Sequence, residues 1–142
     1  MKTDRALELL DARRSEFAAF ACVAGTRGDV AFLRANGGSD QGPWAMLSTP
    51  GDRWVSLDID GGYSVDHFEE GTSDADVVQM IDLYVEAALA YLRGEVEVSP
   101  GRVLALRTVA VRTSEGRLVL RRSLAGVLKA LVRREAMNRR AE

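Results

Sequence analysis

The spacing of apolar residues predicts a helix at each end of the chain. Residues 4–23 carry apolar side chains on one broad stripe, acidic residues lie in the first turns, and Gly25 can end the helix. A closing helix follows Ser123, a residue type suited to capping. Its apolar residues recur at helical spacing and are Leu124, Val127, Leu128, Leu131 and Val132.

The longest helical pattern lies in the middle of the chain, from residue 74 to about residue 93. Ser73 or Asp74 can cap it, early acidic residues suit the positive end of the helix dipole, and Gly94 can end it. The apolar stripe that we expect to face the core consists of Val77, Ile81, Tyr84, Val85, Ala88 and Leu92.

Alternating apolar residues predict four strands between the first and the middle helix, and two strands before the closing helix. The first four are expected in meander order over residues 29–34, 44–48, 53–58 and 63–68. Tight turns at 49–52 and 60–62 join the last three of these strands, because glycine and proline supply the required backbone angles. Two further apolar runs, 103–111 and 117–120, flank 113–116 and predict another hairpin.

The predicted order of elements is helix, four strands, helix, two strands, helix. This order, without an internal repeat or a long linker, predicts one α+β domain over residues 1–142. We expect an antiparallel sheet of about six strands, with three helices. The length of 142 residues and the 46% of apolar residues suit a single hydrophobic core.

The content of cysteine and histidine limits the chemistry that the chain can perform. Cys22 and His67 are the only residues of their types, which excludes a disulfide framework and a zinc cluster. Cys22 lies in an apolar run and is expected to be buried and inert. Asp66, next to His67 in a strand, points to the opposite face and is badly placed to orient the imidazole. We therefore expect no catalytic residue, metal or cofactor.

Charge is unevenly distributed along the chain. Residues 52–97 hold two Lys/Arg against twelve Asp/Glu, whereas residues 121–142 hold seven against two. The acidic middle either attracts a charged partner or is neutralised within the fold. Nucleic-acid binding by the basic end is not favoured, because its cations lack interleaved aromatic residues and suit a helix C-terminus. No run of about 18 apolar residues occurs, so we expect a cytoplasmic protein without a membrane segment.

An aromatic and acidic surface is the main candidate for function. If Leu57 and its alternate neighbours on the strand at 53–58 face the core, Trp54 and Asp58 face away from it. Aromatic anchors surrounded by charge are typical of protein-binding patches. The alternative is that a helix also covers this face and that Trp54 is an ordinary core residue. The candidate partner-binding residues are Trp44, Trp54, Asp58, Asp60, Tyr63, Asp66 and Glu69.

The segment from Val30 to Gly94 resembles a known class of proteins. It combines strands with a polar, glycine-rich loop, the sequence RWVSL at 53–57, a DGG turn at 60–62, an SDAD helix start and YLRG at 91–94. In these features it is similar to small immunity proteins of bacterial polymorphic toxin systems, and most of all to families that include the antitoxin of the mycobacterial NAD-degrading necrotizing toxin. The resemblance implies an inhibitor that plugs the active site of a toxin. The order of elements also resembles that of secretion chaperones.

Taken together, these patterns predict a non-enzymatic protein-binding module. The leading interpretation is an immunity protein whose acidic and aromatic surface covers the active site of a cognate toxin. One alternative is a secretion-chaperone-like adaptor that holds a secreted client, which a homodimer would favour. Another is a small metal-dependent hydrolase that draws on Asp58, Asp60, Asp66 and Glu69.

Overall fold

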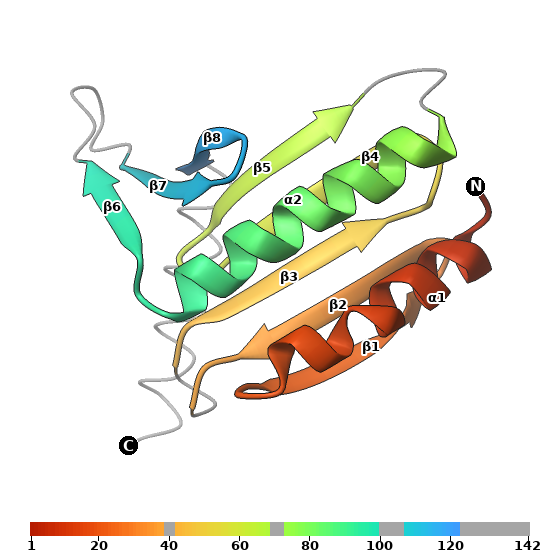
Figure 1. The fold of residues 1–142 in the computed structure, drawn as a ribbon, viewed down its shortest axis with the longest axis horizontal. Helices are drawn as coiled ribbons and strands as arrows, with labels where there is room; N and C mark the ends of the chain where they lie inside the picture. Colours follow the sequence, from red (N-terminus) through yellow and green to blue (C-terminus); the bar gives the residue numbers. More distant parts are fainter. Residues whose placement is uncertain (39–41, 69–72, 100–106, 123–142) are drawn as a thin grey trace.

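An antiparallel sheet runs through the residues that the computed structural model describes, which are 1–38, 42–68, 73–99 and 107–122 (Figure 1). Its eight strands are β1 (Ala21–Arg27), β2 (Val30–Asn36), β3 (Trp44–Thr49), β4 (Trp54–Ile59), β5 (Tyr63–Phe68), β6 (Val96–Ser99), β7 (Thr108–Thr113) and β8 (Gly116–Arg122). Their order across the sheet is β1-β2-β3-β4-β5-β8-β7-β6. The helices in the same ranges are α1 (Thr3–Ala12), α2 (Asp74–Leu92) and a short 3-10 helix over Arg14–Phe17. The α+β class, the antiparallel sheet and the meander from β2 to β5 confirm the sequence prediction.

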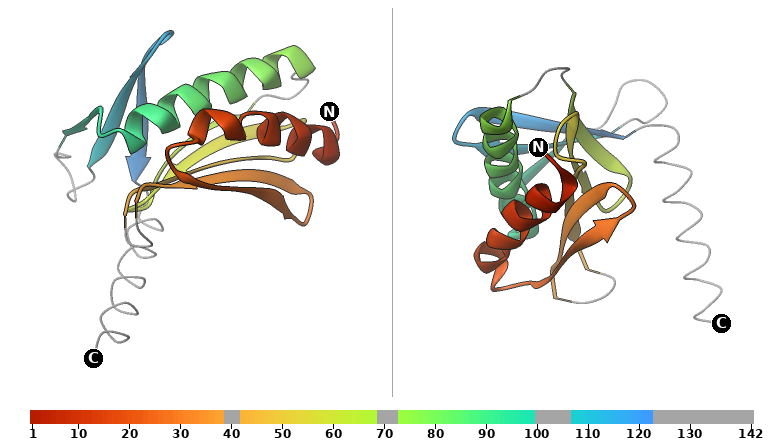
Figure 2. Two further views of the ribbon diagram at one scale, coloured as in Figure 1. Left: turned by 60° about the horizontal axis from the view of Figure 1, so that its bottom comes forward. Right: turned by 90° about the vertical axis from the view of Figure 1, so that its right-hand side faces the viewer.

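Both helices lie on the same side of the sheet (Figure 2). Helix α1 packs on β1 and β2, and α2 packs on β3, β4 and β7. Val55, Leu57 and Ile59 of β4 point to this side and are at most 3% exposed. Trp54 and Asp58 alternate onto the other side and are half-buried. No described helix covers that second side, which we call the open face.

The middle helix forms as predicted. The Ser73 side chain accepts a hydrogen bond from the backbone N–H of Asp76 at 3.2 Å, and the Asp76 carboxylate accepts one from the backbone N–H of Ser73 at 3.2 Å. Hydrogen bonding with Ser73 lowers the pKa of Asp76. Gly94 follows the helix at φ +79°, a left-handed conformation that favours glycine. Every residue of the predicted stripe is buried, namely Val77, Ile81, Tyr84, Val85, Ala88 and Leu92.

The N-terminal helix is shorter than predicted. Helix α1 ends at Ala12, and Ala21–Arg27 form β1, which pairs with β2 along all seven residues. Alanine favours a helix, but the complete ladder of backbone pairs with β2 outweighs that weak preference. Gly25 lies inside this strand instead of ending a helix. A Cβ there would stand 3.2 Å from the Phe32 ring, so the residue permits close packing of the two strands.

The count of elements also differs from the prediction. The sequence patterns do not predict β6, because four residues are too few to show a clear alternation. Together with β1 it raises the expected six strands to eight in the described part of the chain. The closing helix predicted after Ser123 lies outside the described residues, as does 103–106 of the predicted strand at 103–111.

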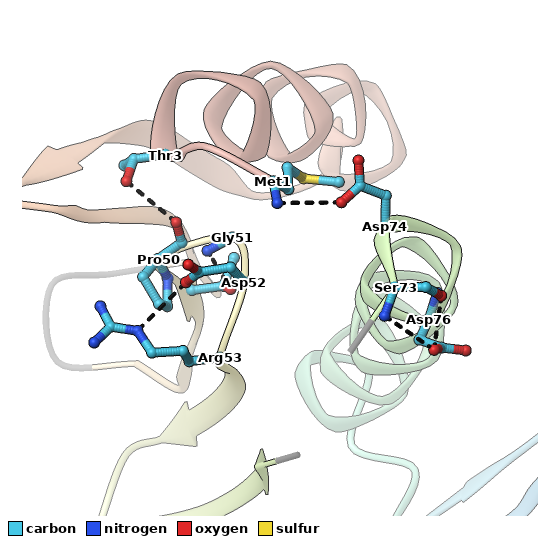
Figure 3. Close-up of polar contacts among 10 residues, drawn as sticks. Met1, Thr3, Pro50, Gly51, Asp52, Arg53, Ser73, Asp74 and Asp76 are labelled. Atoms are coloured by element: carbon cyan, nitrogen blue, oxygen red, sulfur yellow. Dashed lines mark hydrogen bonds and ion pairs between the residues drawn. The ribbon is translucent and has the colours of Figure 1, made fainter. Parts of the chain in front are cut away.

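The N-terminal end of α1 is joined to the β3–β4 turn and to α2 (Figure 3). The Thr3 hydroxyl donates to the carbonyl oxygen of Pro50 at 3.1 Å, and the Met1 ammonium lies 3.1 Å from the Asp74 carboxylate. Gly51 has φ +102°, and a Cβ there would stand 2.9 Å from the carbonyl oxygen of Met1. These contacts fix the two helices against one end of the sheet without involving the open face.

Candidate protein-binding surface

A hollow of about 400 Å³ lies in the open face, over β3, β4 and β5. We call it the β4–β5 hollow. The residues that line it are Ser48, Trp54, Ser56, Asp58, Asp66 and Phe68. The hollow forms because short side chains occupy the centre of this face: Ser48 of β3 lies opposite Ser56 of β4, and the two are 9% and 7% exposed. Larger side chains therefore surround a floor of serines.

Aromatic and acidic side chains lie side by side in the β4–β5 hollow. In the register of β4 and β5, Trp54 lies opposite Phe68, and Ser56 lies opposite Asp66. Asp58 follows on the same face of β4, and its carboxylate accepts a hydrogen bond from the Ser56 hydroxyl at 3.2 Å. Phe68 is 64% exposed and adjoins Trp54 across the strand pair. The hollow thus offers an apolar end and a negatively charged end.

Trp44 shares the open face with the hollow but does not line it. It lies at the start of β3, opposite Asn36 of β2. The Arg34 guanidinium lies 4.7 Å from the centre of the Trp44 ring, within the range of a cation–π contact. Arg34 Nε also donates to Asn36 Oδ1 at 3.2 Å. The ring of Trp44 therefore packs against a basic side chain outside the hollow.

Neither Asp60 nor Tyr63 lines the hollow, and Asp60 holds the β4–β5 turn by hydrogen bonds. Asp60 Oδ1 accepts hydrogen bonds from the Trp44 backbone N–H at 3.0 Å and from the Tyr91 hydroxyl of α2 at 2.5 Å. Burial, followed by the hydrogen bond with Asp60, raises the pKa of Tyr91. Tyr63 points to the helix side of the sheet, and the Arg122 guanidinium lies 5.6 Å from the centre of its ring. Asp60 therefore links the turn to α2.

The structure brings together only part of the candidate set. Trp54, Asp58 and Asp66 line the β4–β5 hollow, and Glu69 lies outside the described residues. Sequence reasoning missed Phe68 and the serine floor. The register would have found Phe68, because counting residue pairs outward from the DGG turn places it opposite Trp54. That these residues bind a partner stays a prediction.

Cys22 and His67, the residues considered for catalysis, lie on two different strands, β1 and β5. Cys22 lies on β1, not in the predicted helix; it is half-buried, and burial raises the pKa of its thiol. His67 and Asp66 are on opposite faces of β5, as expected from the alternation. Within the described ranges, no three His, Cys, Asp or Glu side chains gather to hold a metal ion. None of the helices in those ranges is long and apolar enough to cross a membrane.

Comparisons of the chain with protein-family models, curated protein sequences and solved structures find no match. The resemblance to immunity proteins therefore stays a prediction from the residue pattern. The β4–β5 hollow and the strand register around it are the features that bear on what the chain binds.

Proposed function

We propose that the chain is a non-enzymatic protein-binding module whose β4–β5 hollow receives a basic and partly apolar segment of another protein. One observation carries this proposal. Trp54 and Phe68 meet Asp58 and Asp66 on the face of the sheet that no described helix covers. A half-buried tryptophan beside an exposed phenylalanine and two carboxylates suits a binding surface.

The aromatic and acidic side chains contribute in different ways. Aromatic anchors that lose their water on binding supply most of the affinity of a typical interface. Carboxylates raise the association rate with a positively charged partner and fix its orientation. Residues 52–97, which contain most of the hollow, hold twelve Asp/Glu against two Lys/Arg, so the surrounding charge has the sign that such a partner requires.

The partner in this proposal is a bacterial toxin, and the chain is its immunity protein. An enzyme that acts on an anionic substrate has a basic active-site cleft, and an acidic and aromatic surface seated on that cleft excludes the substrate. The resemblance of residues 30–94 to immunity proteins supports this role. Inhibition by occupation of the cleft requires no reactive group on the chain.

A secretion-chaperone-like adaptor is the second candidate, and one observation favours it. Val23 of β1 also lies on the open face and is 60% exposed, so this face carries a second exposed apolar side chain, separated from Phe68 by β2, β3 and β4. A client segment laid across several strands would use both residues. A homodimer in light scattering would favour the adaptor, whereas a monomer that binds one toxin molecule would favour the immunity protein.

Among the described residues, no three of the carboxylates that a metal-dependent hydrolase would use gather at one point. Asp58 and Asp66 share the hollow, but Asp60 is bound to the Tyr91 hydroxyl and to a backbone N–H of β3. We therefore do not propose hydrolysis.

The test begins with the reading frame next to the gene of this chain. A neighbouring toxin domain that kills when expressed alone should be neutralised when this chain is expressed with it. The double variant Asp58→Lys and Asp66→Lys should abolish rescue and weaken binding at least about tenfold, because like charges then face the basic partner. The melting temperature of the double variant is measured beside binding, because Asp58 accepts a hydrogen bond from Ser56 and a loss of the fold would also abolish rescue.

A matched control reverses two acidic residues elsewhere. Asp29 and Glu95 are exposed and lie outside the hollow, so Asp29→Lys with Glu95→Lys changes the net charge equally. This control should keep rescue and affinity. Equal affinity of both double variants and the wild-type chain would contradict the proposed surface.

A further inference from the structure

Strand β5 has complete pairing on one side and partial pairing on the other. It pairs with β4 along all six of its residues. With β8 it pairs only at Tyr63, opposite Arg122, and at Ser64, opposite Arg121. From Leu120 onward toward the hairpin, β8 pairs only with β7, and the two strands diverge from β5 (Figure 1). In the described part of the chain, residues 65–68 of β5 thus have a neighbouring strand on the β4 side alone.

Such an edge is a template for pairing with another chain. Alternate residues of a strand direct their N–H and C=O groups away from the paired neighbour, and an added strand can bond to them. Residues 65–68 contain no proline, lysine or bulge to block the edge, and their one carboxylate, on Asp66, favours a partner strand that carries a cation. This edge also borders the β4–β5 hollow, because Asp66 and Phe68 belong to both.

We propose that an extended segment of the protein partner adds to residues 65–68 of β5 as a further strand, with a Lys or Arg opposite Asp66 and an apolar residue opposite Phe68. The inference rests on the proposed function and names how the partner docks. Main-chain hydrogen bonds to β5 supply affinity, and the alternate side chains of the segment supply specificity.

The register on β5 fixes the chemistry of the added segment. Directly opposite residues share one face of a sheet, so partner residues opposite Asp66 and Phe68 both lie over the open face. They are therefore two positions apart in the partner. A basic residue meets the carboxylate of Asp66, and the apolar residue meets the ring of Phe68.

Arg121 sets the limit of the added strand. It is exposed on the open face and lies opposite Ser64, where β8 already occupies the edge of β5. A cation of the partner placed two pairs further along would fall opposite Ser64, at the position that Arg121 already occupies, whereas opposite Asp66 it meets a carboxylate. The charges of Asp66 and Arg121 therefore favour the register in which the partner's cation lies opposite Asp66, and the position of β8 permits the same register.

The experiment uses the full chain, labelled with ¹⁵N, and a short synthetic peptide in which Lys and Leu lie two positions apart among threonines. Alternate amides within residues 65–68 should exchange at least about tenfold more slowly when the peptide is bound. The control peptide has the same composition but places Lys and Leu three positions apart, which puts them on opposite faces. It should bind at least about tenfold more weakly.

N-methylation of the peptide backbone distinguishes strand addition from docking by side chains alone. In the bound peptide, every second residue directs its backbone N–H toward β5. Methylating the nitrogens of this first set removes those hydrogen-bond donors and should weaken binding at least about tenfold. Methylating the nitrogens of the other set, which point away from β5, leaves those donors intact and should change the affinity less than about threefold. Equal effects of methylating the two sets of residues would overturn strand addition, as would a failure of the Lys/Leu peptide to bind.

The outcomes separate this inference from the proposed function. If residues 65–68 gain no protection while Asp58→Lys with Asp66→Lys still abolishes toxin binding, docking by strand addition is wrong and the proposed surface stands. If that double variant also binds normally, both proposals fail. Protection that appears on raising the protein concentration, without peptide, would assign the edge to a second copy of the chain and overturn the partner assignment.

Discussion

The helix side and the open face of the sheet are built from alternate residues of the same strands, yet they differ in composition. On β4 the helix side carries Val55, Leu57 and Ile59, all nearly inaccessible to water. The open face of that strand carries Trp54, with Ser56 beneath it in the floor of the hollow. Adjacent residues of one strand therefore have different roles: one stabilises the fold, and the next is available for binding. Substitutions on the two faces should separate stability from affinity.

The largest expected effect on stability is at the centre of the helix side. Leu57→Ala removes a side chain that is 1% exposed and leaves a cavity beneath α2, so we expect a loss of about 2–5 kcal/mol in the free energy of unfolding. Urea unfolding followed by circular dichroism measures it. The control is Asp58→Asn on the opposite face, which should cost less than about 1 kcal/mol. Equal losses at the two positions would contradict the assignment of the faces.

An intermediate effect is expected where α2 meets the β4–β5 turn. Tyr91→Phe removes the hydrogen bond to Asp60, which keeps its second donor, so we expect a loss of about 1–2 kcal/mol at neutral pH. Because the pKa of Tyr91 is raised in the folded protein, its contribution is present below about pH 10 and is lost as the pH rises further. The variant should therefore lose less stability than the wild-type chain in strong alkali.

The Tyr91→Phe variant also tests whether stability and partner binding depend on different faces of the sheet. Partner binding should remain as in the wild-type chain, because Asp60 and Tyr91 do not line the hollow. Urea unfolding from pH 7 to 12 and a binding titration at neutral pH provide the two measurements. Weaker partner binding by a folded Tyr91→Phe would place the Asp60 turn within the binding surface.

The smallest expected effect on stability is at the exposed end of the hollow. Phe68→Ala should change the free energy of unfolding by less than about 0.5 kcal/mol, because the ring is 64% exposed. The same variant should weaken partner binding by about tenfold or more in a calorimetric titration. Val98→Ala is the matched control, since Val98 of β6 is 58% exposed and lies outside the hollow. Equal affinities of the two variants would remove Phe68 from the surface.

Periodicity predicted those elements whose stripe is long or whose turns have strong signals. The stripe of α2 extends from Val77 to Leu92, and a capping serine and a glycine mark its two ends. The turns at Gly51 and Gly61 both require positive φ, so glycine located them correctly. The side of β4 that bears Trp54 followed from simple alternation.

Local patterns failed where partners distant in the chain decide the structure. An apolar stripe continued the predicted first helix to residue 23, but Ala21–Arg27 form a strand because β2 offers a complete ladder. Asp60 looked like a surface acid, but Tyr91 of α2, far along the chain, supplies its hydrogen bond. Phe68 joined the site through the register of β4 and β5, which no single strand pattern contains.

The narrow junction between β5 and β8 has a consequence for the order of folding. Each hairpin from β1 to β5 closes between neighbouring strands, so its loop entropy is small. Pairing of β8 with β5 must instead close a loop that contains all of α2. Only two residue pairs between the two strands offset the entropy that closing this loop costs. We expect the first five strands to assemble early and the β6–β8 unit to dock late. Until then, Val109, Val111 and Leu120 remain in water, which makes the interval before docking the one most exposed to aggregation.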